Sequence, residues 1–207
     1  MNLSRPYAVV SPTLDGAVLA ALAGTTRPLT GREVARLAGR RNHSGALDVL
    51  NRLTEQGIVS RQEAGSALLY TLNREHLAAP AVESLMNLRL ELIRRLEEVI
   101  AGWRPVPVHA SVFGSAARGD GDSASDVDLF LVRPDGVHAE DSLWRDQVNR
   151  LSELVKLWTG NRASIAEVGL DELPRLTTEP PPIIAELRAD AVTLAGAELS
   201  RVFERSP

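Results

Sequence analysis

The sequence predicts an α+β protein made of two folded units joined by a helix. Its 207 residues exceed one typical domain of roughly 150 residues. Up to Pro80 the chain carries 9 basic and 6 acidic residues, whereas the remainder carries 14 basic and 21 acidic residues. The first part reads as helices followed by a pair of strands, and the second as strands alternating with helices. We therefore expect two units with different surface charge.

Composition excludes several classes of protein. The sequence contains no cysteine, so disulfides, cysteine-ligated zinc, iron-sulfur clusters and thiol catalysis are impossible. No apolar run reaches the 18 residues of a membrane span, and the first residues lack the pattern of a secretion signal. The expectation is a cytoplasmic protein without a membrane partner.

Three helices are predicted in the first unit. Apolar residues recur at helical spacing in each segment, and Thr30 precedes Glu33 by the three residues of a capping box. The expected boundaries are Asp15, as a cap, and Gly24 for the first helix, Thr30 and Gly39 for the second, and Ser44 and Gly57 for the third.

Two strands are predicted after these helices, Ile58 to Gln62 and Ala67 to Leu72, with a turn at residues 64–66. The segments LTGREVARLAG, SGALDVLNRLTEQGIV and LLYTLN, in this order, resemble the winged helix-turn-helix family over residues 10–75. The resemblance implies binding to double-stranded DNA, with the start of the third helix in the major groove and the hairpin on the backbone. The residues assigned to DNA are Arg40, Arg41, Asn42, His43, Ser44 and Arg61. The alternative is a unit that mediates only dimerisation or protein contacts, since a fold does not fix a function.

One long helix is predicted for the connector, residues 81–103, because its apolar residues fall near one stripe. Such a helix can pack on either unit or on its copy in a homodimer. Arg104 to Pro107 then ends it. The predicted division is a winged unit at 1–80, a connecting helix at 81–104 and a second domain at 105–207.

The most informative segment is VHASVFGSAARGDGDSASDVDLFLVRP, residues 108–134. An apolar strand leads into Gly114 and Ser115, and a second strand carries Asp126 and Asp128. Alternation along a strand puts these two carboxylates on one face, where they repel unless a cation neutralises them. Mg²⁺ prefers carboxylate oxygens together with substrate phosphates. Gly114 allows a close backbone approach, and Ser115 adds a hydroxyl where a helix begins. The segment therefore predicts a phosphate site beside a metal site.

This segment resembles the DNA polymerase β-like nucleotidyltransferases, and among them the minimal members with Gly-Ser, a spacer and Asp-X-Asp. The resemblance implies a mixed β-sheet flanked by helices, an NTP substrate, and Mg²⁺ held by Asp126 and Asp128 while Gly114 and Ser115 orient the phosphates. Arg118 is assigned to phosphate charge, although a merely solvated arginine fits equally well. The family pattern usually includes a third carboxylate on a neighbouring strand. The segment 161–168 is the predicted strand, and Glu167, its only acid, is nominated as the third catalytic residue; a surface role stays open.

Two functions follow from these resemblances. In the first, the protein transfers a nucleoside monophosphate from an NTP to a hydroxyl of a partner protein or of tRNA, and the winged unit brings it to DNA, as in antitoxin-like proteins. In the second, it is a DNA-binding regulator whose transferase-like half only binds nucleotide or assembles the protein. Modification of a small molecule leaves the winged unit without a role.

Overall fold

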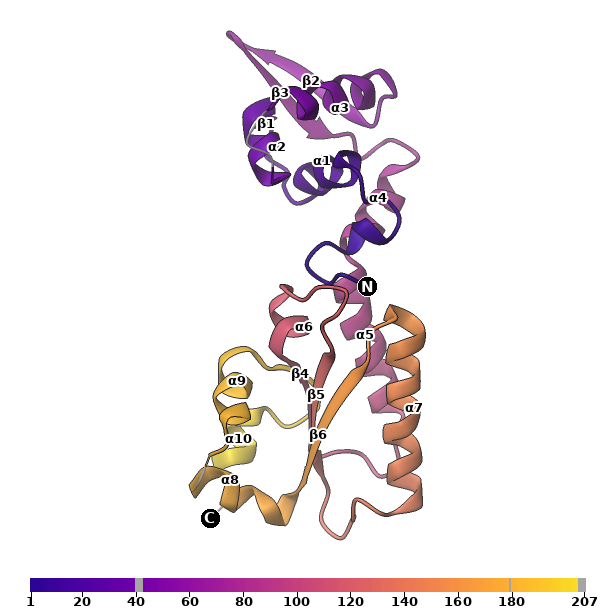
Figure 1. Ribbon diagram of the computed structural model, residues 1–207, viewed down its shortest axis with the longest axis vertical. Coiled ribbons are helices and arrows are strands. Elements are labelled where there is room, and N and C mark those ends of the chain that lie inside the picture. Colours follow the sequence, from indigo (N-terminus) through magenta and orange to yellow (C-terminus); the bar gives the residue numbers. More distant parts are fainter. Residues whose placement is uncertain (40–42, 179, 205–207) are drawn as a thin grey trace. The chain divides into compact units, whose positions relative to one another are not determined.

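A computed structural model describes residues 1–39, 43–178 and 180–204. Contacts divide the chain into two compact units (Figure 1). The N-terminal unit is Arg5–Leu88, and the C-terminal unit is Arg89–Pro207 together with Met1–Ser4.

The N-terminal unit packs helices against a three-stranded antiparallel sheet of order β1-β3-β2. The three predicted helices and the predicted hairpin are confirmed, and a two-residue strand, β1, completes the sheet. Its elements are a 3-10 turn (Pro6–Val9), α1 (Leu14–Ala23), β1 (Leu29–Thr30), α2 (Gly31–Leu37), α3 (Ser44–Glu55), β2 (Val59–Ala64), β3 (Ala67–Leu72) and α4 (Ala79–Met86). Val18, Leu50 and Tyr70 are buried in its core.

A local signal explains where α2 begins. Thr30 accepts the Glu33 backbone N–H at 3.3 Å, and Glu33 accepts the Thr30 N–H at 2.7 Å, which forms the predicted capping box. The prediction that Asp15 caps the first helix is wrong, because the N-cap residue is Thr13. Asp15 lies in the first turn instead, where its carboxylate pairs with Arg52 of α3.

The predicted connecting helix is two helices. α4 ends at Met86, and α5 (Leu88–Ala101) begins after Asn87, which has left the helical conformation. Val82 of α4 is buried in the N-terminal unit, whereas Leu92 and Leu96 of α5 are buried in the C-terminal unit. The continuous apolar stripe therefore serves two different cores.

The C-terminal unit is built on a mixed four-stranded sheet of order β6-β5-β4-β7. β5 pairs antiparallel with β4 and parallel with β6, and β7 pairs antiparallel with β4. This confirms the predicted mixed sheet flanked by helices. The elements after α5 are β4 (His109–Phe113), α6 (Gly114–Arg118), β5 (Val127–Arg133), α7 (Ser142–Thr159), β6 (Ala163–Gly169), a 3-10 turn (Leu170–Glu172), α8 (Leu173–Thr178), α9 (Pro182–Asp190), β7 (Val192–Gly196) and α10 (Leu199–Glu204).

Helices cover both faces of this sheet (Figure 1). We call the face packed with α5 and α7 the α7 face, and the face packed with α8, α9 and α10 the α9 face. Leu129 and Leu131 of β5 are buried on the α7 face, and Phe130 and Val132 on the α9 face. β5 is thus buried on both sides, which explains its continuous apolar run after Asp128.

The first residues of the chain belong to the C-terminal unit. The Leu3 side chain is buried in the same core as Leu151 and Val155 of α7. The backbone N–H of Ser4 donates to the carbonyl of Gly121 at 2.9 Å. Residues 5–88 are therefore inserted between two parts of the C-terminal unit.

Candidate active site

Gly114 fixes the geometry of the predicted phosphate turn. It lies directly after β4 and has a φ of 62°, a left-handed conformation that favours glycine. A Cβ atom at this position would lie 2.6 Å from Oδ2 of Asp128. Any other residue would therefore collide with the Asp128 carboxylate. The neighbour of Gly114 in this structure is thus an aspartate, and the predicted close approach to a phosphate stays a prediction.

Only Asp128 lies on β5, which begins at Val127, so the prediction that one strand carries both Asp126 and Asp128 is wrong for Asp126. Asp126 is exposed in the preceding loop, and Asp128 is half-buried on the α9 face. Burial raises the pKa of the Asp128 carboxyl, and the negative charges of Asp126 and Glu186 raise it further. A hydrogen bond from the Ser164 hydroxyl and the charge of Arg118 lower it in part. The protein therefore leaves this carboxylate short of positive charge.

The loop between α6 and β5 is held in shape by Asp122 and Asn161. Oδ1 of Asp122 accepts the backbone N–H groups of Ala124 at 2.8 Å and Ser125 at 2.9 Å. These hydrogen bonds lower the pKa of the Asp122 carboxyl. The buried side chain of Asn161 donates from Nδ2 to the Ser125 carbonyl at 2.8 Å. A Cβ atom on Gly121 would lie 2.8 Å from the Ser115 hydroxyl oxygen, so the loop packs closely on the Gly-Ser turn.

Helix α9 adds an acid that the sequence analysis did not nominate. Oδ1 of Asp190 accepts the backbone N–H of Gly114 at 3.3 Å, and its Oδ2 pairs with Arg118. Arg118 also donates from Nε to Asp120 at 3.0 Å. Both carboxylates raise the pKa of the Arg118 guanidinium. Arg118 is thus an ion-paired residue in this structure, not a merely solvated one.

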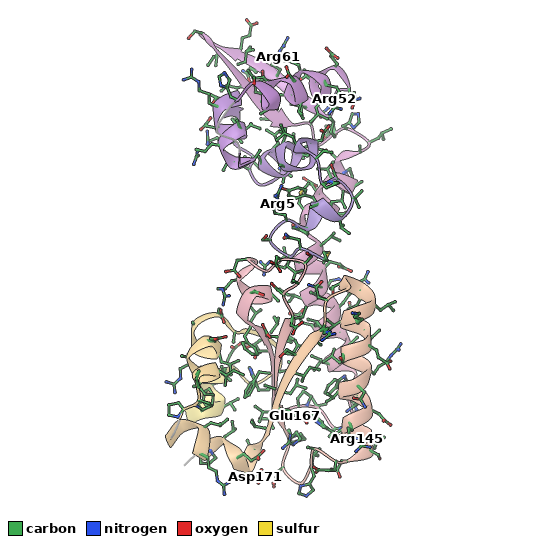
Figure 2. All side chains as sticks on the ribbon, in the orientation of Figure 1. Arg5, Arg52, Arg61, Arg145, Glu167 and Asp171 are labelled. Carbon is green, nitrogen blue, oxygen red and sulfur yellow. The ribbon has the colours of Figure 1, made fainter. Side chains whose placement is uncertain are left out.

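Glu167 lies away from the paired aspartates, which corrects its nomination as the third catalytic residue. Asp128 is paired in register with Ser164, three positions before Glu167 on β6. An odd offset puts a strand residue on the opposite face, so Glu167 is on the α7 face. Figure 2 shows Glu167 toward the end of β6 that is remote from α6.

The Glu167 carboxylate has structural partners. It accepts the indole N–H of the buried Trp144 at 2.7 Å and lies 3.7 Å from the Arg133 guanidinium. The position on β6 that faces Asp128 is occupied by the hydroxyl of Ser164. The neighbouring strand therefore supplies a hydrogen-bond donor to Asp128 instead of a third acid.

Two further residues near the Gly-Ser turn, Asp122 and Asp190, were not predicted from the sequence. The sequence contains a local signal for the first but none for the contact of the second. Asp122 precedes Ser125 by three residues in a Gly-rich and Ser-rich loop, a spacing that predicts a local side-chain turn. Asp190 is the last residue of α9, where an acid is opposed by the helix dipole. An acid at that position indicates a compensating contact elsewhere in the fold, but the sequence does not say where.

The residues present fit Mg²⁺ only together with a substrate. Among the residues that the structure describes, no group of three or more His, Asp or Glu side chains could hold a metal ion. Asp126 and Asp128 supply two carboxylates. Mg²⁺ is typically bound by one or two carboxylates and completed by substrate phosphates and water. The pair is compatible with that arrangement.

The predicted DNA contacts lie partly outside the described residues, since Arg40, Arg41 and Asn42 fall there. His43 is the N-cap residue of α3, and both His43 and Ser44 are exposed. Arg61 is exposed on β2 (Figure 2). Further along α3, the exposed side chains include those of Asp48 and Glu55. Among the described residues, exposed arginines lie on α2 (Arg32 and Arg36), near the end of α3 (Arg52) and on β2 (Arg61).

A segment of the C-terminal unit matches a known family. Residues 93–168 match the family model described as a nucleotidyltransferase domain. The match runs from α5 into β6 and includes Gly114, Ser115, Asp126 and Asp128. It supports a transferase of the class that moves nucleoside monophosphates. The chain matches no curated protein. Within the described ranges, no helix is both long and apolar enough to span a membrane.

Proposed function

We propose that this protein is an Mg²⁺-dependent nucleotidyltransferase that moves a nucleoside monophosphate from an NTP to a hydroxyl of a protein or an RNA. The observation that carries the proposal is the approach of Gly114 to Asp128. A backbone N–H and an under-neutralised carboxylate share one small region next to the Gly-Ser turn. A phosphate group and a cation together would satisfy both.

In this proposal the reaction is a displacement at the α-phosphorus. The acceptor hydroxyl releases its proton to solvent as its oxygen forms a bond to phosphorus, the bond to the bridging oxygen breaks, and pyrophosphate leaves. The Gly114 N–H and the Ser115 hydroxyl bind phosphate oxygens. Asp122 and Asn161 keep the loop in the shape that orients them. Asp126 and Asp128 would hold Mg²⁺, which stabilises charge on the attacking and leaving oxygens when it is bound.

Incubation of the full-length protein with α-labelled NTPs, Mg²⁺ and a lysate of its source cells tests this function. We expect label on a protein or RNA band, and protease or ribonuclease treatment identifies the acceptor class. Asp126→Asn should abolish labelling because it removes half of the metal-binding pair. Asp135→Asn, the same change at an exposed acid in the turn after β5, is the matched control and should label normally. Equal labelling by Asp126→Asn would sink the proposal.

The N-terminal unit favours a second function, binding of duplex DNA in the manner of a winged helix-turn-helix. The observation is its exposed positive charge: Arg61 on β2, and Arg32 and Arg36 one turn apart on α2, are all exposed. Arg61→Ala should weaken duplex binding and lower the salt slope by about 1, because one phosphate contact is lost. Arg145→Ala, on α7 of the other unit, removes the same charge and should leave binding unchanged. Identical salt curves for all three proteins would favour the protein-contact alternative.

Both assays together separate the two overall functions. The presence of Ser164 opposite Asp128, where the family pattern suggests an acid, favours a regulator whose transferase half binds nucleotide without transferring it. DNA binding without any label transfer would support that alternative. Label transfer that depends on Asp126 would support the enzyme.

A further inference from the structure

The Asp190 carboxylate is an acid in an unfavourable place. It ends α9, where the helix dipole opposes a negative charge, and its side chain is only 12% exposed. Such an acid costs free energy unless donors compensate it. The contacts of Asp190 must therefore offset the free-energy cost of placing a carboxylate at this position.

The two groups that donate hydrogen bonds to Asp190 are groups that we assign to the binding of nucleotide phosphates. One carboxylate oxygen accepts the Gly114 N–H and the other pairs with the Arg118 guanidinium. A backbone N–H has a single hydrogen. It cannot donate a full hydrogen bond to Asp190 and to a phosphate oxygen at the same time. A phosphate that binds Gly114 has to displace the carboxylate.

We propose that Asp190 is a specificity-determining residue that occupies the phosphate position of the nucleotide-free site and admits only anions strong enough to displace it. This inference rests on the proposed function of the Gly114 turn. A carboxylate and a phosphate present similar acceptor oxygens to an arginine, so the exchange preserves the type of contact. A polyphosphate with Mg²⁺ gains additional contacts at Asp126 and Asp128. A single phosphate does not, and it competes poorly with a carboxylate that is already part of the chain.

Asp120 provides an internal control for this proposal. Its carboxylate also accepts from Arg118, at 3.0 Å from Nε. Within the described residues its hydrogen bonds do not include Gly114, and its side chain is largely exposed. Neutralising Asp120 therefore removes the same charge from the same arginine and leaves the Gly114 N–H occupied.

Calorimetric titration of the full-length protein with pyrophosphate and with orthophosphate, both with Mg²⁺, tests the proposal. Asp190→Asn should tighten pyrophosphate binding about tenfold, the scale of one hydrogen bond to a charged group. It should strengthen orthophosphate binding by a larger factor, which reduces the preference for pyrophosphate. Asp120→Asn should change either Kd by no more than about threefold, as expected of an exposed pair.

Disruption of the fold would weaken binding, so a gain of affinity distinguishes competition from damage. Asp190→Ser provides a second variant without the carboxylate if Asp190→Asn does not fold. If the wild type binds pyrophosphate and neither Asp190 variant binds more tightly than Asp120→Asn, the inference is wrong and the proposed function stands. If no variant binds pyrophosphate, the inference and the proposed function are both wrong.

Discussion

Each face of the C-terminal sheet carries an acid, Glu167 on β6 and Asp128 on β5. The two acids have opposite electrostatic surroundings. On the α7 face, Glu167 accepts a hydrogen bond from the buried Trp144 and lies near Arg133. On the α9 face, Asp128 shares its surroundings with two further acids, Asp126 and Glu186. An acid that has hydrogen-bond and ion-pair partners stabilises the fold. An acid that faces other negative charges destabilises it, and a bound cation can offset this loss of stability.

The comparison predicts its largest effect at Asp128. Asp128→Asn should reduce nucleotidyl transfer by more than about a hundredfold, because a bound metal contributes several kcal/mol of charge stabilisation. The same variant should melt at or above the temperature of the wild type in metal-free buffer, since it relieves repulsion. Initial rates of label transfer and thermal melts measure both quantities. A variant that is inactive because it is unfolded would break the comparison.

Glu167 should behave in the reverse way. Glu167→Ala leaves the Trp144 N–H without its acceptor and should lower the free energy of unfolding by about 1–3 kcal/mol. Transfer per folded molecule should stay near the wild-type rate, because the carboxylate is on the other face. Glu140→Ala, an exposed acid before α7, is the control for loss of charge. If Glu167→Ala instead loses most of its transfer activity without losing stability, Glu167 has a catalytic role after all.

A smaller effect is expected on the pH dependence of stability. The pKa of Asp128 is raised in the folded protein, so the folded state holds this proton more tightly than the unfolded state. The contribution of Asp128 is therefore greatest at low pH and is lost as the pH rises through the raised pKa. Unfolding free energies of the wild type relative to Asp128→Asn should fall over this range without metal. Mg²⁺ should reduce that fall, and parallel profiles with and without Mg²⁺ would contradict the metal assignment.

The smallest effect is expected at Ser164. Ser164→Ala removes the hydroxyl that donates to Asp128, which raises the pKa of that carboxyl further. Metal affinity should fall by about tenfold, the lower end of what outer partners of metal ligands contribute. A Mn²⁺ titration measures this change, and Ser142→Ala at the start of α7 is the matched control. Unchanged Mn²⁺ affinity would show that the Ser164 hydroxyl does not affect metal binding by Asp128.

The comparison also explains which parts of the site could be predicted from the sequence. Gly114, Ser115, Asp126 and Asp128 fall within one short window, so their spacing alone predicts that they lie in one region, although Asp126 precedes β5 and is not placed by strand alternation. Glu167 depended on the register of β6 against β5. A shift of one residue exchanges the two faces of a strand, and nothing local in the sequence specifies that register. Being the only acid on the strand was therefore a weak criterion.

The same limit applies to the rest of the fold. The capping box at Thr30 and the hairpin were predictable because their signals are local. The break at Asn87 was not, since the apolar stripe runs on through it and only the separate cores of the two units require the interruption. Asp190 reaches Gly114 through the packing of α9, a contact between distant segments that no periodicity predicts.

The insertion of residues 5–88 also sets an order of events during synthesis. Domains tend to fold as they leave the ribosome, and the N-terminal unit draws all its contacts from one continuous stretch of chain. Leu3 and Ser4 are made before that stretch but have no partners until α7 and Gly121 have emerged. The nascent chain must therefore keep its first residues available while a complete unit folds behind them. A chain shortened to start at residue 89 would lack Leu3 in the core and the Ser4 hydrogen bond to the loop between α6 and β5.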